Sequence, residues 1–198
     1  REFMMMVELT SVDNSVLPVT ELTDHLKLAS GFSDDGSQND QLESCLRAAL
    51  SAIEARIGKA LFRRRFALQM HSWQSSERQS LPIAPVVSVE TVKVISRMGG
   101  ETVLEPARYQ LLQDTHRPVV KPVGGGLPHP SQGGSVEVEF TAGFGETWQD
   151  IPADLKHAVL ILAVEFYNAT PGSEGGMPLA VTVLIEPYRR LRLGGGAS

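Results

Sequence analysis

Apolar residues at helical spacing predict two helices in the first third of the chain. The longer stripe consists of Leu42, Leu46, Ala49, Leu50, Ile53 and Ile57. Its members follow one another three or four residues apart, with one adjacent pair, which places them on one face of an α-helix. Gly58 comes directly after the stripe, where glycine commonly ends a helix. A shorter helix is expected to start near Pro18 and to stop at Gly31, with Leu22, Leu26 and Ala29 on its apolar face.

From about Phe62 to Phe144 the helical pattern gives way to alternation of apolar and polar residues. Phe66, Leu68 and Met70 alternate with polar or small neighbours, and so do Val136, Val138 and Phe140. This period of two is typical of half-buried strands. Further strands are expected over residues 86–95, 102–104, 109–112 and 118–120. A Gly/Pro-rich loop over 123–134 separates the expected strand at 118–120 from the strand that carries Val136, Val138 and Phe140. The length of this loop points to function or disorder.

Helical spacing returns at Asp150, after the strands. The expected buried stripe of this helix is Leu155, Ala158, Val159, Leu162, Ala163 and Phe166. Pro152 stands where a first-turn proline is tolerated. A last segment, residues 179–193, is expected to carry an apolar side that Pro187 interrupts, made of Val183, Leu184, Tyr188 and Leu191.

The order of helices, strands and helices predicts an α+β protein, mainly an α-helical bundle with an inserted small antiparallel β subdomain. Residues 1–17 are interpreted as a cloning remnant (Arg1–Phe3) and an extended N-terminal segment. The expected divisions are then 18–61 for the N-terminal helices, 62–149 for the β subdomain and 150–193 for the C-terminal helices. Residues 194–198 are expected to form a flexible tail.

Composition narrows the function classes. The 198 residues are 42% hydrophobic and carry a net charge of -5, whereas proteins that bind duplex DNA or anionic membranes on their own usually carry excess positive charge. The single cysteine, Cys45, excludes an intrachain disulfide and a cysteine-cluster zinc site. The longest strongly apolar run, residues 158–167, is about half of the ~20 residues that span a membrane. We therefore expect no membrane association and no signal peptide, and assembly in a reducing cytoplasm.

The pattern of chemically reactive residues disfavours an enzyme. None of the histidines stands three to five residues from another, so no helical metal pair is predicted; they are His25, His71, His116, His129 and His157. Gly58-Lys59-Ala60 lacks the remaining residues of a phosphate-binding loop, and no nucleophile elbow is present. Glu137 and Glu139 share a strand face, as they also would on a solvated strand. We predict no catalytic residues, no metal and no cofactor.

Two arginine clusters remain as candidate contact sites. Arg63, Arg64 and Arg65 follow the long N-terminal helix and fit either a solvated turn or a grip on an acidic partner surface. Arg189, Arg190 and Arg192 lie on a terminal segment with little chain left to bury its apolar residues. Such an amphipathic segment either packs on its own fold or docks on a partner.

Several segments in order resemble the head–tail connector (adaptor) proteins of long-tailed phages and their gene-transfer-agent relatives. The similarity covers roughly residues 17 to 192. The segments that carry it are Pro18-Val19-Thr20, His25-Leu26-Lys27-Leu28, Ile57-Gly58-Lys59-Ala60-Leu61, Leu81-Pro82-Ile83-Ala84-Pro85-Val86-Val87-Ser88-Val89, Val138-Glu139-Phe140-Thr141-Ala142-Gly143-Phe144-Gly145, Ile151-Pro152-Ala153-Asp154-Leu155-Lys156-His157-Ala158 and Leu184-Ile185-Glu186-Pro187-Tyr188-Arg189-Arg190.

The resemblance implies a structural protein of the virion neck, the junction of head and tail. About twelve copies would form a ring under the portal protein, present a surface to a stopper or tail-completion protein, and let DNA pass through the lumen without sequence-specific binding. The implied portal-docking residues are Pro187, Tyr188, Arg189, Arg190 and Arg192. Arg63, Arg64 and Arg65 are candidates for other partner contacts, and an acidic chain suits a lumen that must not retain DNA.

Two alternative functions stay open at this stage. The first is a stopper or tail-completion protein of the same particle, although such proteins are usually shorter and mostly β. The second is a small ligand-binding or enzymatic α+β domain with a pocket between the β subdomain and the helices. Phage, prophage and gene-transfer-agent origins are not separated by the sequence.

Overall fold

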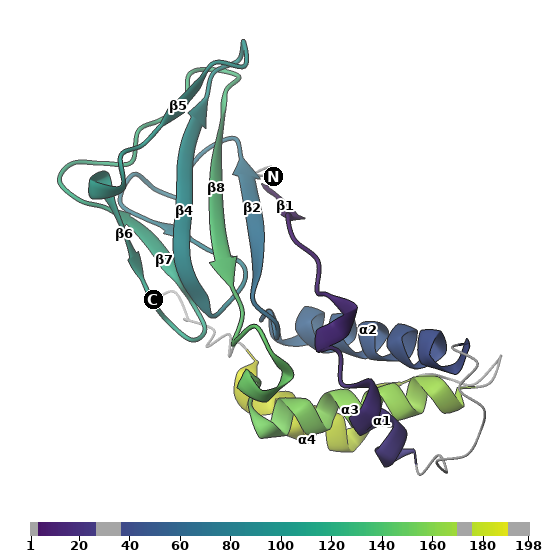
Figure 1. Ribbon diagram of the computed structural model, residues 1–198. Coiled ribbons are helices and arrows are strands. Elements are labelled where there is room, and N and C mark those ends of the chain that lie inside the picture. Colours follow the sequence, from purple (N-terminus) through teal and green to yellow (C-terminus); the bar gives the residue numbers. More distant parts are fainter. Residues whose placement is uncertain (1–3, 27–36, 170–175, 190–198) are drawn as a thin grey trace. The chain divides into compact units, whose positions relative to one another are not determined.

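The chain forms two compact units, each built from segments that are distant in sequence. The computed structural model describes residues 4–26, 37–169 and 176–189. The β unit comprises residues 1–12 and 62–144, and the helical unit comprises residues 13–61 and 145–198. Figure 1 shows the strands in the first and the helices in the second.

The β unit contains two antiparallel sheets. The larger sheet has the order β1-β2-β8-β4-β5, with β1 spanning Met4–Glu8, β2 Arg64–Met70, β8 Ser135–Ala142, β4 Val86–Ile95 and β5 Glu101–Val103. The smaller sheet has the order β3-β7-β6, with β3 spanning Gln79–Ser80, β7 Val119–Pro122 and β6 Tyr109–Leu112. A 3-10 turn, η2 (Pro106–Arg108), precedes β6.

The core of the β unit follows the predicted alternation. Phe66, Leu68 and Met70 of β2 pair with Phe140, Val138 and Val136 of β8, and all six side chains are buried. The rings of Phe66 and Phe140 stack with centroids 5.7 Å apart. The predicted strands of this region are present, with boundary shifts of one or two residues. Part of the Gly/Pro-rich loop is anchored, since Leu127 is buried and the carbonyl of Pro128 accepts a hydrogen bond from the indole of Trp73 at 2.8 Å.

The strand β1 was not predicted. It pairs with β2 from Met4 opposite Met70 to Glu8 opposite Phe66, and all five of its residues are exposed. Because the run Met4–Val7 contains no polar residue, it shows none of the alternation by which the other strands were recognised. All five residues of β1 are exposed, so no difference in burial between its two faces requires such alternation.

Four helices and three 3-10 turns build the helical unit among the residues described. The helices are α1 (Val19–His25), α2 (Ser37–Ile57), α3 (Ala153–Asn168) and α4 (Leu179–Ile185). The turns are η1 (Asn14–Val16), η3 (Trp148–Asp150) and η4 (Glu186–Tyr188). Helix α3 packs against both α2 and α4. The predicted stripe of α2 is buried throughout, and Gly58 ends the helix at a φ of 67° with its amide bonded to the Glu54 carbonyl.

Three expectations about helix faces are corrected or fall outside the described residues. Phe166 was expected in the buried stripe of α3 but is 38% exposed. On α4 the expected apolar side included Val183, which is 64% exposed, because Val181 and Ile185 are the residues that α4 buries. Ala29, Gly31 and Leu191 lie outside the described residues. The final helix ends at Ile185, before Pro187, because a proline in the helix interior removes a backbone donor.

The chain is an α+β protein, as predicted, but the expectation of a mainly helical bundle is not confirmed. Helices make up 37% and strands 29% of the structure. The share of strand is larger than a mainly helical bundle would have. It comes in part from β1, from the length of β4 and β8, and from the second sheet.

Gly143 is predicted to be indispensable to the β unit. A Cβ at this position would lie 2.3 Å from the carbonyl oxygen of Phe62, and the backbone φ is 134°. Gly99 is a matched control, because its φ is also positive (83°) but nothing lies within 4 Å of an added Cβ. We expect Gly143→Ala to lower the free energy of unfolding by about 3 kcal/mol or more, and Gly99→Ala by about 1 kcal/mol. Urea unfolding followed by tryptophan fluorescence measures both, and equal losses would contradict the clash.

Candidate functional site

Arg64, one of the three candidate contact arginines, is held within the β unit. Its guanidinium donates to the Glu8 carboxylate at 2.9 Å and lies 5.4 Å from the centroid of the Phe66 ring. Only 10% of its side chain is exposed. The ion pair with Glu8 links Arg64 on β2 to β1, while its second contact is within β2.

Arg63 and Arg65 lie on either side of Arg64 and are more open to solvent. Arg65 forms an ion pair with Glu139 at 2.9 Å, and half of its side chain is exposed. Its backbone amide donates to the hydroxyl of Thr10 at 2.9 Å. Arg63 is exposed and directly precedes β2. The structure therefore brings the three arginines together at one end of β2, but not onto one shared face.

A ladder of alternating charges crosses the polar face of the larger sheet. The Lys93 ammonium lies 3.3 Å from Glu137, 3.3 Å from Glu139 and 3.8 Å from Glu101. Hydrogen bonds to Glu139 and Glu137 raise the pKa of Lys93, because they favour its charged form. With Arg65 on the far side of Glu139, both carboxylates on β8 are ion-paired. The ladder therefore links β4 and β8 across the polar face of the sheet.

An open groove of about 530 Å³ lies beside the start of β4 and includes Glu90 and Tyr109 in its lining. Hydrogen bonds from Ser88 (2.6 Å) and Thr141 (2.8 Å) lower the pKa of Glu90. Burial raises the pKa of Tyr109, with a smaller contribution from the charge of Glu90. The groove thus holds a charged carboxylate and a neutral phenol.

Neither a metal-binding cluster nor a membrane-spanning helix occurs in the residues that the structure describes. No cluster of three or more histidine, cysteine, aspartate or glutamate side chains suitable for a metal occurs in residues 4–26, 37–169 and 176–189. The rings of His25 and His157 meet edge to face at 6.1 Å, but only two ligands would be available there. None of the helices described is long and apolar enough to span a bilayer.

The candidate portal-docking residues lie at the end of the helical unit. Pro187 and Tyr188 belong to η4, and Arg189 follows with an ion pair to Glu186 at 2.8 Å. Arg190 and Arg192 lie outside the described residues. The Tyr188 hydroxyl donates to the Asp154 carboxylate in the first turn of α3 at 2.8 Å. Burial and this hydrogen bond raise the pKa of Tyr188 to about 12.

Tyr188 therefore has a structural role that the sequence did not reveal. Asp154 and Tyr188 are separated by 34 residues, and no spacing rule links them. Their contact fixes the point at which the chain continues toward Arg190. The exposed apolar strand β1 was missed as well.

We predict that Tyr188→Phe lowers the free energy of unfolding by about 1–2 kcal/mol at pH 8, because the Asp154 carboxylate loses a hydrogen-bond donor. The folded-state pKa is raised above the ordinary value of 10.0 to about 12. The stabilisation from Tyr188 is therefore complete below pH 10 and is lost as the pH rises toward 12. Urea unfolding of both proteins across this range tests the prediction. A difference between them that stays constant from pH 8 to the alkaline limit would contradict it.

Comparisons with known proteins place the chain among neck proteins of gene transfer agent (GTA) particles. No family model and no curated protein matches it. A chain in the neck of an empty GTA particle, solved with sixfold symmetry, is 42% identical, with a TM-score of 0.88 over 98% of this chain and 100% of that chain. A chain in the virion of a native GTA particle is also 42% identical, with a TM-score of 0.86 over 97% and 98% of the two chains.

A third solved structure, the neck of a native GTA particle with twelvefold symmetry, contains a chain that is 40% identical. Its TM-score is 0.84, and the match covers 98% of this chain and 100% of that one. Identities of this size over nearly complete chains establish common descent as well as a common fold. The chain therefore belongs to the head–tail connector family represented by these GTA neck proteins.

Proposed function

We propose that the protein is a head–tail connector (adaptor) that forms a ring under the portal, joins the DNA-filled head to the tail and lets DNA pass. The observation that carries this proposal is the match at 42% identity, over 98% of this chain and 100% of the other, to a protein of a GTA neck. The proposed place of action is the virion neck of a GTA or a related phage or prophage particle, after assembly in the bacterial cytoplasm.

The proposed assembly is a ring of about twelve copies. The similar neck structures were solved with sixfold and twelvefold symmetry. In a ring of identical subunits, one surface of each copy binds a different, complementary surface of the next copy. Such head-to-tail contacts close into a ring only when the rotation per subunit divides a full turn. The role is structural, with no cofactor, since the similar chains are components of particles.

The end of the helical unit is the proposed portal-docking segment, with Pro187, Tyr188, Arg189, Arg190 and Arg192. The Tyr188–Asp154 hydrogen bond supports this, since it holds the start of the segment on α3 while the chain continues into an arginine-rich sequence. Arginine pairs well with carboxylates on a partner because its guanidinium forms two parallel hydrogen bonds. Arg63 and Arg65, on the β unit, are the proposed contacts to the stopper or tail-completion protein.

DNA in the lumen is proposed to be guided by repulsion. The chain carries 23 acidic against 18 basic residues, so a ring of copies has a large net negative charge. Repulsion of this kind keeps a duplex away from the wall, whereas a basic lumen would bind phosphates and slow ejection.

Deletion of the gene in the producing strain tests the proposed function. We expect DNA-filled heads without tails in negative-stain images, and rescue by the gene in trans. Incubation of the purified protein with portal-bearing heads that lack all other neck proteins separates adaptor from stopper, because only an adaptor binds the portal directly. Normal tailed particles from the deletion strain would contradict a joining role, and failure to bind such heads would favour a stopper.

Charge removal from the docking segment gives a sharper prediction. The triple variant Arg189→Gln, Arg190→Gln and Arg192→Gln is expected to bind portal-bearing heads at least about tenfold more weakly, because several charge-assisted contacts are lost. The matched control neutralises three exposed cations of the β unit, Arg78, Arg97 and Lys121. Co-sedimentation with heads measures both variants, and equal losses would show that only overall charge matters.

A further inference from the structure

The strand β1 leaves one edge of the larger sheet open. The Leu9 amide donates to the Arg65 carbonyl at 2.8 Å. Antiparallel strands alternate between residues that bond to the partner strand and residues whose backbone groups point away. The register with β2 therefore directs Val7 and Met5 toward β2 and leaves the amide and carbonyl groups of Met4, Met6 and Glu8 on the open side.

This open edge is apolar and exposed, which is unusual for a free edge. Met4, Met5, Met6, Val7 and Leu9 are between 41% and 57% exposed. Soluble proteins normally protect such edges with charge, proline or bulges. The only charge on β1 belongs to Glu8, and that carboxylate is paired with Arg64. An edge of this kind suits a strand that is covered when the protein is assembled.

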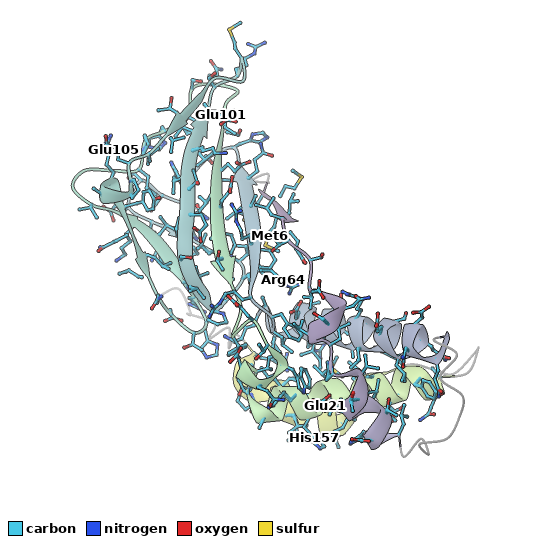
Figure 2. The ribbon with its side chains drawn as sticks, viewed as in Figure 1. Met6, Glu21, Arg64, Glu101, Glu105 and His157 are labelled. Atoms are coloured by element: carbon cyan, nitrogen blue, oxygen red, sulfur yellow. The ribbon has the colours of Figure 1, made fainter. Side chains whose placement is uncertain are left out.

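The opposite edge of the same sheet, β5, is open as well. Leu104 donates its amide to the Val92 carbonyl at 2.8 Å, so the alternation directs the backbone groups of Glu101 and Val103 away from β4. All three residues of β5 are exposed. Figure 2 labels Met6 on β1 and Glu101 on β5, on the two outermost strands of the sheet.

A groove of about 390 Å³ adjoins β5. Its lining consists of Val94, Thr102, Val103, Leu104, Glu105, Arg108 and Pro128. Thr102 lies opposite Val94 on the face of the sheet that also carries Val92, a core residue. Methionine side chains are long and flexible and fill irregular apolar grooves well. Met4 and Met6 lie on the corresponding face of β1, since they pair with Met70 and Leu68.

We propose that β1 of one copy adds to β5 of a second copy of this chain and that this pairing joins neighbouring subunits of the ring. The inference rests on the proposed ring function. The sheet has five strands that are all antiparallel, so its two outer strands run in the same direction. Copies placed side by side in one orientation therefore bring β5 of one against β1 of the next as a parallel pair.

Parallel pairing also matches the faces of the two strands. In a parallel pair, a residue whose amide and carbonyl point toward the adjacent strand lies opposite a residue whose amide and carbonyl point away from the first strand. We choose the register that centres the pair, in which Met6 lies opposite Thr102 and bonds to the backbone of Glu101 and Val103. Because Met6 and Thr102 occupy the same core-side face, the core sides of adjacent sheets line up, and Met6 enters the groove beside β5.

Two different edges are what a closed ring needs. A pair formed by β1 with β1 of another copy would be two-fold symmetric and would end at a dimer. A β1–β5 pair leaves the other edge of each copy free, so the contact repeats until the ring closes.

Disulfide cross-linking in assembled particles tests the pairing. Cys45→Ser gives a cysteine-free background, since Cys45 is the only cysteine. We expect Met6→Cys combined with Thr102→Cys to give a ladder of cross-linked multimers on non-reducing gels, because opposite residues in adjacent strands lie within disulfide range. The matched control, Met5→Cys with Thr102→Cys, is expected to cross-link at least about tenfold less, since Met5 faces the other side of β1.

The outcomes separate this inference from the proposed function. Absence of the protein from purified particles contradicts the proposed function itself. Particles that contain the double variant but show no ladder contradict the β1–β5 pairing alone, and so does equal cross-linking of the control. Dimers from Met6→Cys without the second cysteine would point to β1–β1 pairing and overturn the inference.

A charge at the edge gives an independent readout. Met6→Lys places a charge where an apolar side chain is proposed to enter the groove beside β5, and we expect about tenfold fewer tailed particles because the apolar contact is lost and the edge becomes charged. Met5→Lys adds the same charge on the other face and is expected to leave more tailed particles than Met6→Lys. Thermal unfolding of both purified variants checks that the monomers fold alike, and equal particle yields would contradict the proposal.

Discussion

The antiparallel pairing of β2, β8 and β4 is the constraint on which the rest of the β unit depends. It places Phe66, Phe140 and their apolar neighbours on one face and the charged residues of the ladder on the other. A shift of register by one residue would put Lys93, Glu137 and Glu139 into the core, so the pattern permits a single alignment. This alignment also fixes which residues of the outer strands lie on each face. The two edges of the sheet differ, because β1 is largely apolar and β5 adjoins a groove.

The helical unit relies on a different kind of contact at its C-terminal end. Helix α4 has only seven residues, fewer than an isolated helix needs, so its position depends on burial of Val181 and Ile185 and on the turn that follows. The hydrogen bond from Tyr188 to Asp154 ties that turn to α3. Leu179 and Val183 remain exposed on the other side of α4. The arginine-rich chain that follows Tyr188 therefore starts from a defined point on the helical unit.

Periodicity predicted the elements whose two faces differ in polarity, and it failed where they do not. The stripes of α2 and β8 were recognised because burial on one side forces alternation or helical spacing. Strand β1 was missed because all of its residues are exposed and Met4–Val7 are all apolar. Val183 was misplaced because every residue of α4 except Thr182 is apolar, so the sequence does not mark one face. The clusters at Arg63–Arg65 and at Arg189 were visible in the sequence, but their ion pairs with Glu8, Glu139 and Glu186 depend on contacts that no local rule encodes.

A short edge-to-edge contact suits a subunit that must stay soluble before it assembles. A parallel pair of about five residues contributes only a few backbone hydrogen bonds, each worth roughly 1 kcal/mol net, so two free copies associate weakly. Copies held side by side on a portal meet at a high effective concentration, and the same weak contact then becomes favourable at every position of the ring. Under the proposed function, the portal would supply the geometry and the proposed β1–β5 pairing would supply the lateral contact. The same weak interface would then account for a monomer in solution and a ring in the particle.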